Sequence, residues 1–273
     1  MERQDKMNLD RTKLEQELKT RWAARNLRCY DEVDSTNLEM IRLAKEGAPH
    51  GTLVVADSQS AGKGRLGRKW VSPKGTGIWM SILLRPDIAP QSASMLTLVA
   101  ALAVVKGIDC ETGLPVQIKW PNDVVLGGRK LCGILTEMST EAGDIRYVVP
   151  GIGVNVNMTE FPPEVSETAT SLRLELGREI EREPLIARVM EAFEGYYEKF
   201  LKTQDLAGLT EEYNRRSVNL GRQVKVLDPA GNFQGEAMGI DSQGSLLVKM
   251  ADGQVRQVIS GEVSVRGVYG YAL

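Results

Sequence analysis

Short apolar runs, separated by polar residues, fill the chain from Leu27 to about Asn157. Two longer stretches, residues 37–46 and 92–108, have the length and the apolar spacing of helices. Many strands with few helices between them are typical of an α+β fold. We therefore predict a central mixed, largely antiparallel sheet with flanking helices on one side. The apolar runs predict strands over residues 28–33, 53–56, 78–84, 116–119, 124–126, 131–138 and 147–156.

Turn sequences indicate where these strands reverse and where a second domain begins. Gly127 and Gly128 separate two predicted strands and favour a tight hairpin. Residues 184–203 and 208–216 predict two helices, the first with aromatic residues on its core side. Beyond them, short β-rich runs alternate with turn sequences, which predicts a small all-β barrel. We place a main domain at residues 26–217 and the barrel at 218–273.

The first 25 residues are strongly charged and carry Leu9, Leu14, Leu18 and Trp22 at roughly helical spacing. This spacing predicts one amphipathic helix that extends the main domain at residues 1–25 and lies on its surface. A helix-turn-helix needs at least two packed helices and a turn, so we do not expect DNA binding.

Composition and charge indicate the class of protein. The chain has 273 residues, of which 42% are hydrophobic and 26% charged, with a net charge of −2. This balance is typical of a soluble globular protein and offers no general attraction to nucleic acids or membranes. The longest apolar run, residues 95–105, is short of the roughly 20 residues that span a bilayer. The first residues lack an apolar signal core, so we expect a cytoplasmic protein.

Few side chains suit nucleophilic or metal catalysis. The three cysteines, Cys29, Cys110 and Cys132, are scattered, and we expect reduced, buried thiols. The single histidine, His50, excludes multi-histidine metal sites and leaves little room for a Ser-His-Asp triad. Any catalysis should therefore depend on Lys, Arg, carboxylates and backbone donors.

The segment from Gly62 to Trp70 alternates glycines with four cations. It matches the spacing G-x-G-x-x-G of dinucleotide-binding turns, but the residues after the third glycine start a helix poorly, which disfavours a dehydrogenase. Glycines let the backbone move, and the cations suit an anionic ligand. We interpret the segment as an anion-binding loop, with a solvated basic loop as the alternative.

Four further segments carry polar groups that suit a binding site. Lys119-Trp-Pro-Asn-Asp123 closes a predicted strand and could hold hydrated Mg²⁺ and phosphates, or be a simple turn. Thr36 and Glu39 have the spacing of a helix capping box, and Gln59 precedes the glycine loop. Lys130 lies at a hairpin mouth. The fourth segment has glycines at 151 and 153, which leave one face of a strand bare, so that a flat ligand or another backbone can approach.

In this order the segments resemble those of the biotin–protein ligase family. The resemblance runs from about Leu27 to the C-terminus and depends on three motifs together: the glycine loop ending in Lys69-Trp70, residues 119–123, and residues 129–135. It implies a sheet related to that of class II aminoacyl-tRNA synthetases and a C-terminal SH3-like barrel. It also implies ATP and biotin as substrates, Mg²⁺, and a biotin carboxyl carrier protein as acceptor.

The resemblance also implies roles for individual residues. Lys63, Arg65 and Lys130 would be the catalytic cations, and Asp123 would bind the metal. The residues implied for the biotin site are Ser35, Thr36, Asn37, Gln59, Lys63, Gly64, Arg65, Lys130, Gly133, Gly151 and Asn155. Those implied for ATP and adenylate are Gly62, Arg68, Trp70, Lys119, Asn122 and Asp123.

Two departures and two alternatives accompany the resemblance. Lys63 stands where Arg is more usual, and the charge is kept without the bidentate fork. The chain looks like the enzyme-only form, without the DNA-binding domain of family members that repress transcription. A lipoate ligase or octanoyltransferase would share the scaffold, and a non-catalytic biotin sensor is the alternative outside enzymes. A homodimer is compatible with the sequence, which does not fix the oligomeric state.

Overall fold

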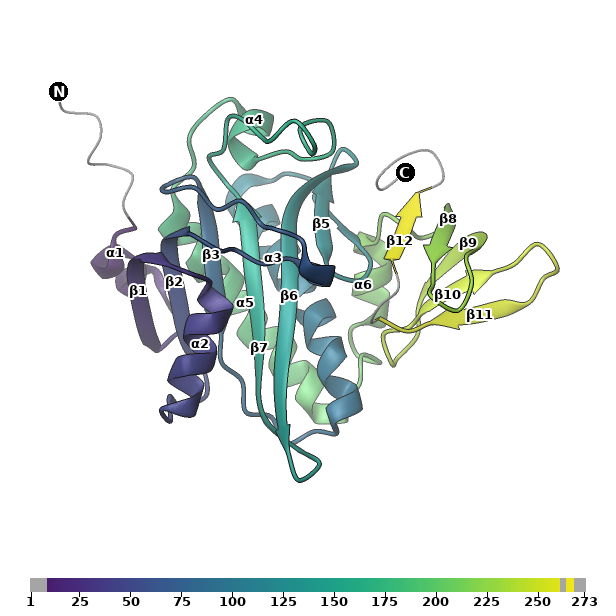
Figure 1. The fold of residues 1–273 in the computed structure, drawn as a ribbon, viewed down its shortest axis with the longest axis horizontal. Coiled ribbons are helices and arrows are strands. Elements are labelled where there is room, and N and C mark those ends of the chain that lie inside the picture. The colour runs from purple at the N-terminus through teal and green to yellow at the C-terminus, as the bar shows by residue number, and fades with distance from the viewer. Residues whose placement is uncertain (1–8, 261–263, 268–273) are drawn as a thin grey trace.

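The computed structural model describes residues 9–260 and 264–267. Its main domain is built on a seven-stranded sheet in the order β1-β2-β3-β7-β6-β5-β4 (Figure 1). Only β1 and β2 pair in parallel, which confirms the mixed, largely antiparallel sheet. The strands are β1 (Asn26–Val33), β2 (Thr52–Gln59), β3 (Gly77–Ile82), β4 (Gln117–Lys119), β5 (Asp123–Leu126), β6 (Arg129–Glu141) and β7 (Asp144–Asn155).

The hairpin between β5 and β6 turns at Gly127 and Gly128, as predicted. Both residues have positive φ, 56° and 78°, which a two-residue hairpin turn of this type requires and glycine adopts without strain.

Helices cover both faces of the sheet, so the expectation of helices on one side is wrong. Helices α3 (Met95–Thr112) and α5 (Arg182–Thr203) pack together against one face. Helix α2 (Thr36–Lys45) covers the other face, where Met40 packs against Val54 and Tyr147. Strand β2 is buried along nearly its whole length, and such a continuous apolar strand needs cover on both faces.

Helix α3 is apolar all round and forms the centre of the core. The segment Pro90–Thr112, which joins the 3₁₀-helix η2 (Pro90–Ser94) to α3, is long and apolar enough to cross a membrane by composition alone. However, 72% of its most apolar window is buried inside the protein. A helix that is hydrophobic on every side and enclosed in this way belongs to a protein core.

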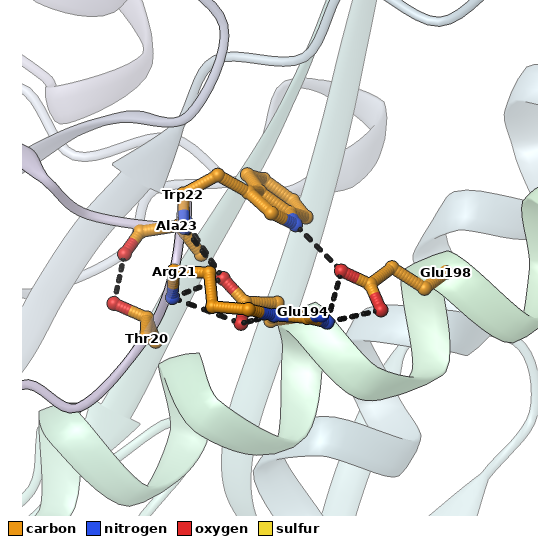
Figure 2. A network of polar contacts seen from close by, with 6 residues as sticks. All are labelled: Thr20, Arg21, Trp22, Ala23, Glu194 and Glu198. Carbon is orange, nitrogen blue, oxygen red and sulfur yellow. Dashed lines mark hydrogen bonds and ion pairs between the residues drawn. The ribbon is translucent and has the colours of Figure 1, made fainter.

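The N-terminal helix is shorter than the sequence pattern predicted. Within the described residues, α1 runs only from Arg11 to Glu17, and Leu18 is already extended. Trp22 lies in a turn, which Glu194 of α5 holds by accepting the backbone N–H groups of residues 21–23 (Figure 2). These bonds favour the turn over another helical turn. The part of the prediction on residues 1–8 lies outside the described residues.

We predict that Glu194→Gln lowers the free energy of unfolding at pH 7 by about 1–2 kcal/mol. Burial raises the pKa of Glu194, but the N–H groups of residues 21–23 outweigh it and hold that pKa below its usual value. A lowered folded pKa gives stability above the unfolded pKa, which is lost as the pH falls through the folded pKa. Urea unfolding at pH 7 and at about pH 3 should therefore show the two proteins converging in acid. Glu198→Gln, at the more exposed neighbour, is the control and should have a smaller effect at pH 7.

The C-terminal residues form the predicted small β domain. It follows α6 (Thr210–Arg216) and is a five-stranded antiparallel sheet in the order β11-β10-β9-β8-β12. Each predicted turn is closed by a glycine N–H that donates to the carbonyl oxygen three residues earlier; these glycines are Gly231, Gly244 and Gly253. The strands are β8 (Gln223–Leu227), β9 (Phe233–Ile240), β10 (Leu246–Lys249), β11 (Val255–Val258) and β12 (Ser264–Gly267). The domain limits at 25/26 and 217/218 stay predictions.

Trp120 joins the two sheets. Its backbone N–H donates to Asn219 Oδ1 at 2.9 Å, and its indole Nε1 donates to the carbonyl oxygen of Gly244 at 3.0 Å. The ring is fully buried. The hydrogen bonds of Trp120 therefore anchor the segment from Lys119 to Asp123 to the small domain. They also fix the position of the polar residues that follow Trp120.

The thiols are free but only one is buried, which corrects the expectation for the other two. Cys132 is buried, Cys29 is half-buried and Cys110 is exposed. Cys110 lies in the last turns of α3, beyond the part of that helix that packs all round into the core.

Candidate functional site

A small cavity opens on the face of the sheet that α2 covers in part. Its walls come from the start of α2, the end of β2, the glycine loop, and the middles of β6 and β7. The cavity, called here the first cavity, has a volume of about 50 Å³. The predicted biotin-site residues that line it are Ser35, Thr36, Asn37, Gln59, Lys63, Gly64, Arg65, Lys130, Gly133 and Gly151.

A second cavity, of about 480 Å³, adjoins the first and shares Gly64, Arg65, Trp70, Asn122 and Lys130 with it. It extends to the loop after β7 and to β12 of the small domain. The predicted ATP-site residues that line it are Arg68, Trp70, Lys119, Asn122 and Asp123.

Two residues with implied roles lie elsewhere than expected, and one further residue joins the site. Asn155 lines the second cavity rather than the first. Gly62 lines neither; a Cβ there would lie 2.3 Å from the Trp70 carbonyl oxygen, so its glycine lets the two sides of the loop approach closely. Arg266 of β12, which no sequence motif indicated, adds a cation from the small domain to the second cavity.

The start of α2 is not the predicted capping box. Ser35 is the N-cap and its side chain makes no cap hydrogen bond. The Thr36 backbone N–H donates instead to Gln59 Oε1 at 2.9 Å, and Ser81 of β3 lies 2.8 Å from the Thr36 hydroxyl. Gln59 thus satisfies a helix N–H that a cap would otherwise bond, and the hydroxyls at the helix start belong to a wider network.

That network continues through the Asn37 side chain. Ser81 donates to Asn37 Oδ1 at 2.6 Å, and Asn37 Nδ2 donates to the Leu135 carbonyl oxygen and to Glu137 Oε2. Ser81 and Asn37 are buried. Ser81 and Glu137 could not be identified from the sequence, because a serine or a glutamate inside a strand pattern carries no signal of its own.

The face that the alternating glycines of β7 leave bare was expected to admit a flat ligand or another backbone, but at Gly153 it is covered by a side chain, the indole of Trp70. A Cβ at Gly153 would lie 2.6 Å from Trp70 Nε1, and one at Gly133 of β6 would lie 3.0 Å from Trp70 Cζ3. The Asn37 amide lies equally close to Gly151, where a Cβ would be 2.0 Å from Asn37 Oδ1. Trp70 fills much of the space beside these glycines, which explains the small volume of the first cavity.

Charged groups gather where the two cavities meet. Lys130 Nζ lies 2.5 Å from Asp123 Oδ1, and Lys119 Nζ lies 3.6 Å from Asp123 Oδ2. Burial lowers the pKa of Lys119 to about 8, although Asp123 opposes that shift. Arg65 reaches the same place and donates to Asn122 Oδ1 at 3.0 Å. An anion that entered here would meet cations from three separate segments.

The same cluster bears on the predicted magnesium site. The Asp123 carboxylate is already contacted by two lysines, and residues 9–260 and 264–267 contain no group of three or more His, Cys, Asp or Glu that could hold a metal. These residues do not make a protein cage for Mg²⁺. Magnesium usually keeps several waters and binds through one or two carboxylates plus substrate phosphates.

The backbone of Lys130 is held on its free side by the loop after β7. Its N–H donates to the Thr168 carbonyl oxygen at 2.7 Å, and its own carbonyl oxygen accepts from the Thr170 N–H at 2.9 Å. This loop and the short helix α4 (Leu172–Leu176) were not predicted, because the residues show neither strand nor helix periodicity. The single histidine, His50, lies outside both cavities, where Nδ1 accepts the Arg85 N–H.

Comparison with known proteins identifies the family of this chain. Residues 30–155 match the biotin/lipoate A/B protein ligase family, and residues 220–266 match the biotin protein ligase C-terminal domain. The bifunctional ligase/repressor BirA of Bacillus spizizenii is 40% identical over 91% of this chain and 76% of its own length. The chain belongs to the biotin protein ligase family.

Two further family members match this chain over most of their own length. The biotin–[acetyl-CoA-carboxylase] ligase of Paracoccus denitrificans is 35% identical over 83% of this chain and 94% of its own. The biotin protein ligase of Aquifex aeolicus, solved in complex with biotin and ATP, is 32% identical with a TM-score of 0.78. That match covers 89% of this chain and 99% of the Aquifex chain, so the family fold extends over both sheets.

Proposed function

We propose that the protein activates biotin with ATP to biotinyl-5′-adenylate and transfers the biotinyl group to a lysine of a biotin carboxyl carrier protein. The observation that carries this is the meeting of the two cavities at Arg65 and Lys130. The first cavity, with its hydroxyls and amides, suits biotin, and the second suits the nucleotide. The solved Aquifex relative holds both molecules.

The first step joins two anions. A biotin carboxylate oxygen bonds to the α-phosphorus of ATP, and pyrophosphate leaves. Lys63, Arg65 and Lys130 would lower the repulsion between the two groups, because fixed cations in a poorly hydrated site stabilise developing charge. Magnesium would arrive with ATP and neutralise its phosphates, with Asp123 and Asn122 near by.

The second step needs no nucleophile from this chain. The amine of the acceptor lysine attacks the acyl carbon of the adenylate, AMP leaves with the electron pair of the broken bond, and the amine loses a proton to solvent as the amide forms. The glycine loop would exclude water from the mixed anhydride between the two steps. This agrees with the site residues, none of which forms a Ser, Cys and His constellation.

An intact-mass assay tests the proposal and its two rivals. The protein is mixed with Mg-ATP and an apo carrier domain, in parallel with biotin, lipoate or octanoate. A gain of one biotinyl group that requires ATP supports the ligase. Transfer of lipoate or octanoate instead would overturn the substrate, and no transfer from any tube would favour a biotin sensor. A cytoplasmic location and a homodimer stay predictions.

We predict that Arg65→Ala releases biotinyl-adenylate at least tenfold faster than the unchanged protein. The variant loses a half-buried guanidinium that ties the glycine loop to Asn122 and that can form charge-assisted bonds to phosphate, each worth about 1.5–3 kcal/mol. Adenylate trapped in the protein and chased with excess biotin gives the rate. Lys74→Ala, just beyond the loop, is the control. An unchanged rate in Arg65→Ala would contradict loop closure.

A further inference from the structure

Strand β6 carries a carboxylate that the proposed reaction does not use. Glu137 lies two residues beyond Leu135, which lines the first cavity, and so its side chain leaves the same face of the sheet. Glu137 lines a groove outside that cavity, between the glycine loop and the start of α3. Its Oε2 accepts the Asn37 Nδ2 at 2.7 Å, so one end of this carboxylate reaches back to the first cavity.

This contact fixes which way the Asn37 amide points. The amide nitrogen donates to two groups that can only accept, the Leu135 carbonyl oxygen at 3.0 Å and the Glu137 carboxylate. The amide oxygen is therefore turned toward Ser81, and it can only accept. Ser81 is fully buried, and its single hydroxyl hydrogen must then go to Asn37 Oδ1 at 2.6 Å.

The direction of these bonds decides what the first cavity offers to a ligand. Because the Ser81 hydrogen is used on Asn37, the Thr36 hydroxyl donates to Ser81 at 2.8 Å or to Gln59 at 3.3 Å. In either case its hydrogen stays inside the protein, and its oxygen presents only lone pairs to the cavity. The ring of biotin is a cyclic urea with two N–H donors, which need such acceptors.

We propose that Glu137 is a positioning residue for biotin: by orienting the Asn37 amide it fixes the buried Ser81 hydroxyl, which in turn sets the Thr36 hydroxyl to accept a ring N–H group. The inference rests on the proposed function and extends it to a residue that touches neither substrate. It concerns biotin only, because Asn37 lines the first cavity and does not line the second.

The test compares steady-state constants for biotin and ATP in the full chain. In Glu137→Ala the biotin KM rises about tenfold, the size expected for one lost hydrogen bond to a charged group, while kcat and the ATP KM stay within twofold. Glu137→Gln keeps an acceptor oxygen and restores the biotin KM to within threefold. Glu141→Ala, at an exposed glutamate on the same strand that forms an ion pair with Arg146, matches the unchanged protein. Thermal unfolding of each variant is measured in parallel.

Ser81→Ala provides a second variant should Glu137→Ala not fold, and it shifts the biotin KM in the same direction. A folded Glu137→Ala with an unchanged biotin KM overturns the inference and leaves the proposed function standing. Equal rises in the biotin and ATP constants also overturn it, because they would indicate a general displacement of β6. An unchanged protein that neither binds nor transfers biotin overturns the proposed function, and the inference with it.

Discussion

Lys130→Ala is expected to slow adenylate formation by about a hundredfold to a thousandfold, the range found when one preorganised donor to a developing charge is removed. Biotin binding should weaken less than tenfold, because the polar groups of the first cavity remain. Lys130 stands where the cavities meet, both its backbone N–H and its carbonyl oxygen are bonded to residues 168–170, and its ammonium lies against Asp123. A cation fixed in this way can stabilise the transition state without reorganising.

Single-turnover pyrophosphate release gives the rate of that step, and calorimetric titration gives the affinity for biotin. Lys130→Arg, which keeps the charge, is the control and should retain more of the rate. Equal losses in rate and in binding would mean that Lys130 only positions the ligand.

Gly151→Ala should weaken biotin binding by more than a hundredfold. A Cβ at this position would lie 2.0 Å from Asn37 Oδ1, so the Asn37 amide must leave its place and break its bonds to Ser81 and Leu135. Overpacking of this kind also costs about 1–3 kcal/mol of stability. Biotin titration by calorimetry, with urea unfolding beside it, separates the two effects.

Gly195→Ala is the matched control, because nothing lies within 4 Å of a Cβ there and the residue is inside helix α5. It should bind biotin normally and gain about 0.5–1 kcal/mol of stability. If Gly151→Ala bound biotin as tightly as the unchanged protein, the first cavity would not be the biotin site.

The strands and the main motifs could be predicted from the sequence because their causes are local. Short apolar runs predicted all seven strands of the large sheet, and paired glycines predicted the hairpin before β6. The faces of the sheet could not be predicted in this way. That α2 packs opposite α3 depends on contacts such as Met40 with Tyr147, which are far apart in the sequence.

In the site, too, the residues of local motifs could be predicted and those brought together by folding could not. Ten of the eleven residues implied for biotin line the first cavity, because they lie in short motifs with recognisable spacing. Ser81, Glu137 and Arg266 have no motif, and only the folded chain brings them to the cavities. The alternating glycines predicted room for a flat ligand or another backbone, and the sequence carried no sign that the Trp70 side chain would fill part of it.

The central hairpin of β6 and β7 has a consequence for how such a protein can change over generations. Gly151 and Gly153 face the first cavity, whereas the side chains of Ile152 between them and Val154 beyond them are buried in the main core. Residues 151 and 153 of this strand are thus selected for the choice of ligand, whereas the side chains of residues 152 and 154 are selected for folding. Drift at the even positions can retune stability while the substrate stays the same, and a relative can acquire another acyl substrate without rebuilding its core.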